Sequence, residues 1–161
     1  MAGIARSFVH HAGIAIDVRS QSAFGRPEHA QKIRPLILVV DDTPIARTVL
    51  RHVLEERGYN VIEAGSTQDA IRAYRDEWPD VVTMDILMDG HNGIVAIQAL
   101  RRIDPKALII VCSATSDKSF VTGAVTLGVE AYLNKPIDSE RLLAVVAKAL
   151  AKSREQRETP N

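Results

Sequence analysis

Short runs of apolar residues recur along the chain at intervals of roughly 20 to 27 residues. They occupy positions 36–40, 60–64, 80–84, 107–113 and 130–134. The first and fourth runs, LILVV and ALIIVCS, are nearly continuous in Val, Ile and Leu. Such runs are typical of strands that are buried on both faces of a parallel sheet. The pattern therefore predicts five short strands.

Helical periodicity follows the first run. Apolar residues spaced i, i+4, i+5, i+8 and i+9 extend from Ile45 to Leu54 and form one face of a helix. Pro44 suits the first turn of this helix, and Gly58 suits its end. The segments after the other four runs predict further helices over 66–78, 94–103, 118–127 and 138–150.

The ends and the strength of these later helices differ. Ser66 and Asp69 have the spacing of a capping box for the second helix. Asp138 or Ser139 is the expected cap of the last helix. The segment 118–127 contains several residues of low helix propensity, so we expect this helix to be the mobile one.

Alternating strands and helices predict an α/β fold, a (βα)5 unit with an all-parallel sheet and helices on both faces. We assign residues 34–151 to this single domain. Residues 1–33 form an N-terminal extension without a clear period, compatible with a flexible arm, a short amphipathic helix or a misassigned start of the chain. Residues 152–161 form a polar C-terminal tail.

The composition excludes several classes of protein. The chain of 161 residues has 20 Lys plus Arg and 20 Asp plus Glu, so its formal net charge of zero predicts no nucleic-acid or anionic-membrane partner. Its one cysteine, Cys112, allows no intramolecular disulfide and no cysteine-based zinc cluster. No apolar run approaches the roughly 18 residues of a membrane span, and charged residues interrupt the N-terminus. We therefore expect a cytoplasmic protein.

Polar residues gather where the predicted strands end. Asp41 and Asp42 follow the first strand, Asp85 the third, Ser113 ends the fourth, and Lys135 follows the fifth. Ligands of parallel α/β sheets bind outside these carboxyl ends, so we expect the five side chains to lie close together. Crowded carboxylates suit Mg²⁺, which prefers oxygen ligands. A carboxylate there could accept a phosphoryl group, whose oxygens a Lys and a Ser would hold.

Each of these residues has an ordinary explanation when taken alone. An Asp-Asp pair before a helix is often an N-cap, a Ser at a strand end often forms a turn, and Lys-Pro in a loop is usually solvated. The joint occurrence at four strand ends favours a functional site.

Residues 35 to about 150 resemble the response-regulator receiver domains, and among them the CheY-like chemotaxis regulators. The resemblance rests on ILVVDD, PDVVTMDILM, NGI, IIVCSA and AYLNKPI, which are spread over the whole predicted domain. It implies a flavodoxin-like sheet with strand order 2-1-3-4-5. It also implies a two-component signalling switch that is not an enzyme in the ordinary sense, with Mg²⁺ as its cofactor.

The resemblance assigns a role to each site residue. Asp85 matches the phosphoacceptor, and Lys135 pairs with the phosphoryl oxygens. Asp41, Asp42, Asp85 and the backbone carbonyl of Leu87 match the Mg²⁺ ligands. Ser113 and Tyr132 match the switch pair that rearranges after phosphorylation. Pro136 matches the proline of a Lys-Pro peptide bond that is often cis in this family. Leu87 and Thr115 lie at the positions that tune the lifetime of the phosphoryl group in the family.

Asp89 stands where the family usually has Pro, so the loop DGHNG lacks the φ restriction of a proline. We expect Asp89 to be a solvated turn residue or, alternatively, a carboxylate near the metal.

The resemblance also implies the partners. A sensor histidine kinase or a phosphotransfer protein would donate the phosphoryl group. A downstream protein would bind the face formed by the fourth helix, fifth strand and fifth helix. We expect the chain to be a monomer or a weak dimer.

Two alternative functions are a phosphorylation-independent adaptor of the same fold and a nucleotide-binding enzyme. The latter is disfavoured because DDTPIAR, and no Gly-rich loop, follows the first strand.

Overall fold

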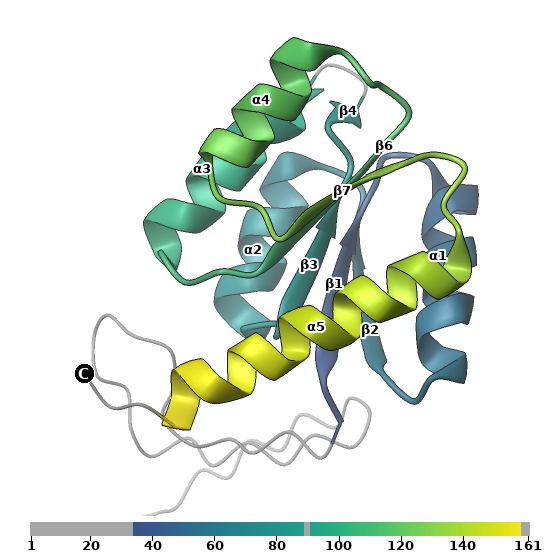
Figure 1. Cartoon of the computed structure of the whole chain (residues 1–161), viewed down its shortest axis with the longest axis vertical. Helices are drawn as coiled ribbons and strands as arrows, with labels where there is room; N and C mark the ends of the chain where they lie inside the picture. The colour runs from purple at the N-terminus through teal and green to yellow at the C-terminus, as the bar shows by residue number, and fades with distance from the viewer. Residues whose placement is uncertain (1–33, 89–90, 159–161) are drawn as a thin grey trace, which may run out of the picture. The chain divides into compact units, whose positions relative to one another are not determined.

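The computed structural model describes residues 34–88 and 91–158 (Figure 1). Its centre is a five-stranded, all-parallel sheet in the order β2-β1-β3-β6-β7, which is 2-1-3-4-5 for the five predicted strands. The strands are β1 (Leu36–Val40), β2 (Asn60–Ala64), β3 (Val81–Met84), β6 (Ile109–Ser113) and β7 (Ala131–Asn134). The predicted α/β class and strand order are confirmed.

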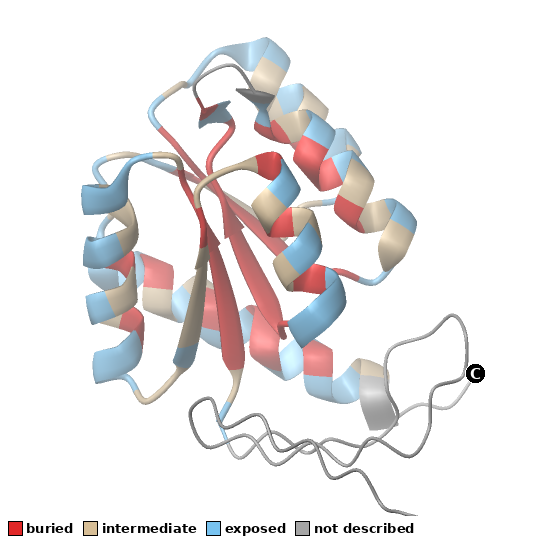
Figure 2. Ribbon diagram, turned by 180° about the vertical axis from the view of Figure 1, so that it is seen from behind, coloured by how far each residue is buried: buried red, intermediate tan, exposed pale blue. Residues whose placement is uncertain are grey.

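Five helices cover the sheet: α1 (Pro44–Glu56), α2 (Thr67–Glu77), α3 (Gly93–Ile103), α4 (Lys118–Thr126) and α5 (Ser139–Glu158). The apolar faces of α1 and α5 pack on one side of the sheet, with Leu54 and Val146 at its centre. Helices α2, α3 and α4 pack on the other side, where Tyr74 and Leu100 are fully buried. The central strands are buried throughout, as Figure 2 shows.

The helix ends follow local side-chain chemistry. The Ser66 hydroxyl accepts a hydrogen bond from the Asp69 amide at 3.1 Å and donates one to the Asp69 carboxylate at 2.8 Å, so Ser66 is the N-cap of α2, and its bond to Asp69 is made by the hydroxyl and not by the backbone amide of a regular capping box. Asp117 caps α4 by accepting from the Ser119 amide at 2.8 Å. Asp138 or Ser139 is the expected cap of α5. The Asp138 carboxylate caps the helix by accepting a hydrogen bond from the Arg141 amide at 2.7 Å.

Strands β6 and β7 begin at Ile109 and Ala131, two residues and one residue later than their predicted runs, and the elements differ from the prediction in three further places. Strand β3 begins one residue later, at Val81, after Asp80, whose carboxylate accepts from the Leu36 amide at 2.8 Å and whose amide donates to the Leu36 carbonyl at 2.7 Å. A two-stranded antiparallel ribbon of β4 (Leu87–Met88) and β5 (His91–Asn92), which the apolar pattern did not predict, follows β3. Helix α5 continues to Glu158, through most of the segment we assigned to a polar tail.

One side-chain bond ties the added part of α5 to the core domain. Ser153 is buried, and Lys152 bonds to the Glu130 carboxylate at 2.7 Å. The expectations for residues 1–33 and for Asp89 fall outside the described residues. Among the helices that the structure describes, we find none with the length and apolar character that crossing a membrane requires.

Candidate functional site

The register of the sheet brings two aspartates together. Val40 pairs with Met84, so the next residues, Asp41 and Asp85, leave the sheet side by side. The Asp85 amide donates to the Val40 carbonyl at 2.9 Å and continues the ladder by one bond. Asp41, Asp42 and Asp85 each have a carboxylate oxygen in a group whose members lie within 4.8 Å of one another. The predicted convergence of these three carboxylates is therefore present.

Backbone amides hold one oxygen of each buried carboxylate. Asp41 and Asp85 have exposed fractions of 0% and 4%, whereas Asp42 is half-buried. Asp41 accepts from the amide of Thr43, and Asp85 accepts from that of Leu87, both at 2.9 Å. Each bond spans two residues and closes a local turn, which fixes the direction of the carboxylate.

Lys135 lies between the two buried carboxylates. Its Nζ is 2.6 Å from Asp41 Oδ2 and 2.8 Å from Asp85 Oδ2, and its amide donates to the Ser113 carbonyl at 2.8 Å. Burial alone would lower the pKa of Lys135, but the bonds to Asp41 and Asp85 outweigh it, so this pKa is raised and the ammonium is charged. The bond to Pro136 is cis.

Ser113 and Tyr132 meet at the backbone of Thr115. Ser113 is fully buried, and its hydroxyl accepts from the Thr115 amide at 3.4 Å. The Tyr132 hydroxyl donates to the Thr115 carbonyl at 2.6 Å. Burial, partly opposed by a hydrogen bond with Ser113, raises the pKa of Tyr132, so this phenol is neutral. Ser113 and Tyr132 thus fix the loop between β6 and α4 through the amide and the carbonyl of Thr115.

Gly93 allows α3 to begin directly against the site. A Cβ at this position would lie 2.3 Å from the Asp85 carbonyl oxygen and 2.6 Å from the Ile86 Cα. The Gly93 amide donates to the Ile86 carbonyl at 2.9 Å. A residue with a side chain would therefore push α3 away from the backbone that carries Asp85, which explains the Gly in the NGI motif.

The donor set fits a hard divalent cation. Three carboxylates against one ammonium leave two negative charges uncompensated, and oxygen ligands in this number are what Mg²⁺ prefers. Asp42 is the more accessible acid of the three. Leu87 follows Asp85 closely and its side chain is exposed, while the role of its carbonyl as a ligand stays a prediction.

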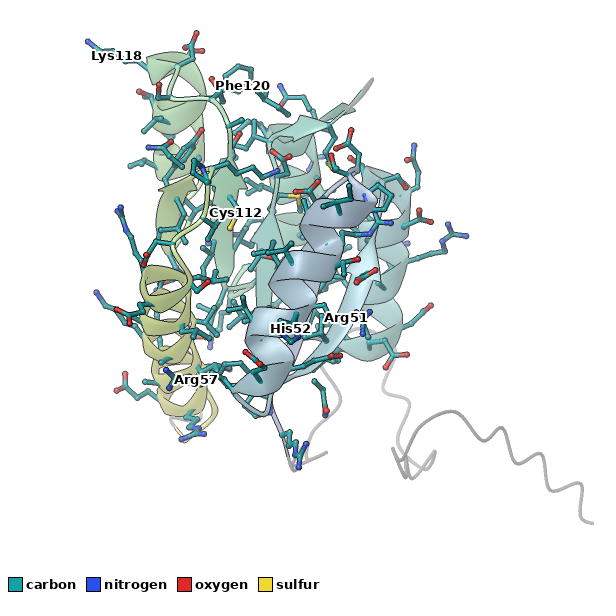
Figure 3. All side chains as sticks on the ribbon, turned by 90° about the vertical axis from the view of Figure 1, so that its right-hand side faces the viewer. Arg51, His52, Arg57, Cys112, Lys118 and Phe120 are labelled. Atoms are coloured by element: carbon teal, nitrogen blue, oxygen red, sulfur yellow. The ribbon has the colours of Figure 1, made fainter. Side chains whose placement is uncertain are left out.

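Cys112 does not contribute reactive chemistry. Cys112 is buried (Figure 3), and burial raises the pKa of its thiol to about 12. Sequence reasoning missed two contributors to the site, Thr43 and Arg47. Thr43 supplies an amide, which has no sequence signature, and the Arg47 side chain donates to the Asp41 carbonyl at 2.7 Å.

Comparison with known proteins gives the family. Residues 37–147 match the model of the response regulator receiver domain. The chain belongs to the response regulator receiver family. It is 36% identical over 115 residues to the chemotaxis protein CheY of Bacillus subtilis, covering 71% of this chain and 96% of that protein. It is 38% identical over 113 residues to CheY of Thermotoga maritima, covering 70% and 94%.

A solved structure agrees with this assignment. The crystal structure of a two-component response regulator of the LuxR family from an Aurantimonas species is 34% identical, with a TM-score of 0.69, and the match covers 74% of this chain and 86% of that one. The receiver domain is therefore a component of two-component signalling. Domains of this family act as signalling switches that interact with kinases and with downstream targets.

Proposed function

We propose that Asp85 of this receiver domain accepts a phosphoryl group from a phosphohistidine in a sensor histidine kinase or a phosphotransfer protein. The observation that carries the proposal is the buried Asp85 carboxylate, bonded to Lys135 and grouped with the carboxylates of Asp41 and Asp42. A carboxylate in this setting can act as a nucleophile. The groups that would neutralise the negative charge of the phosphorylated product, Lys135 and a bound cation, would lie beside it before the reaction.

The reaction forms a bond between a carboxylate oxygen of Asp85 and phosphorus, and the bond from phosphorus to the imidazole nitrogen breaks. The electron pair of the broken bond stays on that nitrogen, and the product is an acyl phosphate. Asp41 and Asp42, with Asp85, would hold Mg²⁺, which supplies positive charge beside the transferred oxygens when it is bound. Lys135 is placed to exchange its bond with Asp85 for one with a phosphoryl oxygen.

Ser113 and Tyr132 would carry the change to the protein surface. A hydroxyl that turns toward a new phosphoryl group gives up its 3.4 Å bond from the Thr115 amide. Since Tyr132 holds the carbonyl of the same residue, movement at Thr115 affects both the aromatic ring and the start of α4. Leu87 and Thr115 border the site, and we propose that they tune the phosphoryl lifetime.

The downstream partner would be a protein that binds the face of α4, β7 and α5. Val125 on α4 is a large apolar residue with an exposed fraction of 62%, so it is accessible to such a partner. Two of the relatives above are named chemotaxis proteins, and this supports an output through protein binding.

Phosphodonor labelling tests the proposal. Incubation with acetyl phosphate and Mg²⁺ should add the mass of one phosphoryl group to the native chain and none to Asp85→Asn. Asp76→Asn, which changes an exposed aspartate on α2, is the matched control and should be labelled like the native chain. Absence of labelling in the native chain, with partner binding intact, would favour the phosphorylation-independent adaptor.

A further inference from the structure

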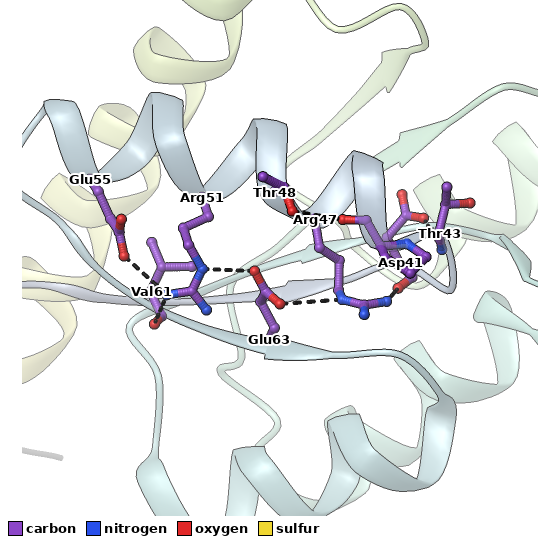
Figure 4. Close-up of polar contacts among 9 residues, drawn as sticks. Asp41, Thr43, Arg47, Thr48, Arg51, Glu55, Val61 and Glu63 are labelled. Atoms are coloured by element: carbon purple, nitrogen blue, oxygen red, sulfur yellow. Dashed lines mark hydrogen bonds and ion pairs between the residues drawn. The ribbon is translucent and has the colours of Figure 1, made fainter. Parts of the chain in front are cut away.

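Arg47 reaches back from the first turn of α1 to the end of β1 (Figure 4). Its Nη1 donates to the Asp41 carbonyl at 2.7 Å, and its own amide donates to the Thr43 carbonyl at 3.2 Å. The side chain and the backbone of one residue thus close the segment 41–43 from both ends. This segment, which we call the acidic turn, carries both Asp41 and Asp42.

The guanidinium is held on its other side as well. Its Nε donates to Glu63 on β2 at 3.4 Å, and the same carboxylate accepts from Arg51 at 2.7 Å. The Arg47 side chain is only 18% exposed. A planar guanidinium with two fixed partners has one orientation, which a flexible ammonium could not reproduce.

Gly65 provides the space that this arrangement needs. A Cβ at position 65 would lie 3.2 Å from Arg47 Nη1, the atom that bonds the Asp41 carbonyl. That distance is tighter than an ordinary contact, so any side chain at this position would push the guanidinium aside.

We propose that Arg47 is a positioning residue for the Mg²⁺ ligands of the acidic turn. The peptide plane between Asp41 and Asp42 contains the carbonyl that Arg47 holds, so fixing this carbonyl fixes the direction in which Asp42 leaves the backbone. Asp42 is the least buried of the three carboxylates, and its placement depends most on the backbone. The inference rests on the proposed function, because it assigns Mg²⁺ to these carboxylates.

The direction in which Mg²⁺ affinity changes when Arg47 is replaced distinguishes a positioning role from a purely electrostatic one. A positive charge near the carboxylates repels a cation, so if Arg47 acted only through its charge, Arg47→Ala would bind Mg²⁺ more tightly. A positioning role predicts the opposite, since residues that orient metal ligands contribute ~10-fold or more to metal affinity. Arg47→Lys keeps the charge and loses the planar fork, so it should behave like Arg47→Ala.

The experiment measures Mg²⁺ affinity by calorimetry and amide hydrogen exchange by NMR on the full chain without any phosphodonor. We expect Arg47→Ala and Arg47→Lys to weaken Mg²⁺ binding ~10-fold. Both should also accelerate exchange at the Thr43 amide, which is held by the Asp41 carboxylate. Gly65→Ala keeps the Arg47 side chain but displaces its guanidinium slightly, so it should shift both readouts in the same direction by a smaller amount.

Arg51→Ala is the matched control. It removes the same charge from the same helix and the same Glu63 network, but Arg51 makes no bond to the acidic turn in the part of the chain that the structure describes. Mg²⁺ affinity and Thr43 exchange should stay at native values. Equal losses in Arg51→Ala, or native behaviour in Arg47→Lys, would overturn the assignment.

The two proposals fail in different ways. A native chain that binds no Mg²⁺ and takes no label would overturn the proposed function. Exchange at Thr43 needs no ligand, so it still decides whether Arg47 holds the acidic turn. Thermal unfolding of each variant shows that the comparison is made between folded proteins.

Discussion

Lys135 has the strongest set of charged contacts in the site. It joins strand ends that are 94 and 50 residues apart in the sequence, through bonds to Asp41 and Asp85. Its ammonium compensates two carboxylates that are almost fully buried. The same residue therefore stabilises the fold, and in the proposed function it would be available to the phosphoryl group afterwards.

Removal of this ammonium should be destabilising. Lys135→Ala leaves Asp41 and Asp85 buried without their cation, and we expect the free energy of unfolding at neutral pH to fall by about 1.5–3 kcal/mol. Denaturant unfolding of both proteins in the absence of Mg²⁺ measures this difference in the free energy of unfolding. The variant should still bind Mg²⁺ and should fail to switch its partner face. Native partner binding by the phosphorylated variant would contradict the role of Lys135.

The pH dependence of that loss has a definite sign. The pKa of Lys135 in the folded chain is raised above its ordinary value of 10.5, so its stabilisation is complete below pH 10.5 and is lost as pH rises through the folded value. The stability difference between the native chain and Lys135→Ala should therefore be constant from neutral pH to about 10 and shrink above it. A stability difference that already shrinks well below pH 10 would contradict a raised pKa of Lys135.

Thr83 offers a test away from the site. This residue of β3 is buried between Val39 and Ile110, and its hydroxyl has no hydrogen-bond partner among the described residues. Thr83→Val replaces the hydroxyl by a methyl of similar size and should stabilise the fold by about 1 kcal/mol. Thr48→Val, at an exposed hydroxyl that bonds the Pro44 carbonyl at 3.0 Å, should give no such gain. Chemical denaturation measures both, and a loss of stability in Thr83→Val would be contrary to expectation.

At the scale of the elements, two glycines that start or interrupt helices have opposite requirements. Gly93 of α3 has no room for a Cβ beside the Asp85 carbonyl. We expect Gly93→Ala to lower stability by about 1–3 kcal/mol, because the backbone of α3 must shift. It should also slow phosphorylation, since α3 rests on the residue that carries the nucleophile. Labelling at the native rate would show that the contact does not position Asp85.

Gly123 of α4 is the matched comparison. A Cβ there would meet Ile94 Cδ1 at 3.6 Å, an ordinary contact, and the residue lies inside a helix. Gly123→Ala should stabilise α4 by about 0.5–1 kcal/mol. Hydrogen exchange should be faster in native α4 than in α5 and should slow in the variant. Equal exchange in both native helices would remove the argument that α4 is the mobile element.

The sequence predicts elements best where local chemistry and burial agree. The five main strands follow from apolar runs, and the α2 start follows from Ser66 and Asp69. The ribbon of β4 and β5 has only two residues in each strand, too few to produce a pattern. The added part of α5 carries the bond from Lys152 to Glu130, a tertiary contact that periodicity along one helix does not contain.

At the scale of the whole domain, strand order turns distant residues into one site. The parallel register places the ends of β1, β3, β6 and β7 at the same edge of the sheet. The residue types at these ends predicted the cluster of acids and Lys135. The Arg47 contact with the Asp41 carbonyl was not predictable, because it depends on Glu63 and Gly65 of a neighbouring strand and loop.

Locating the modified residue shows whether Asp85 accepts the phosphoryl group. The acyl phosphate formed with acetyl phosphate and Mg²⁺ can be trapped by borohydride reduction and mapped by peptide mass spectrometry. We expect the reduced residue at position 85, directly after β3. A reduced residue at Asp89, Asp42 or any other acid, with position 85 unmodified, would contradict it.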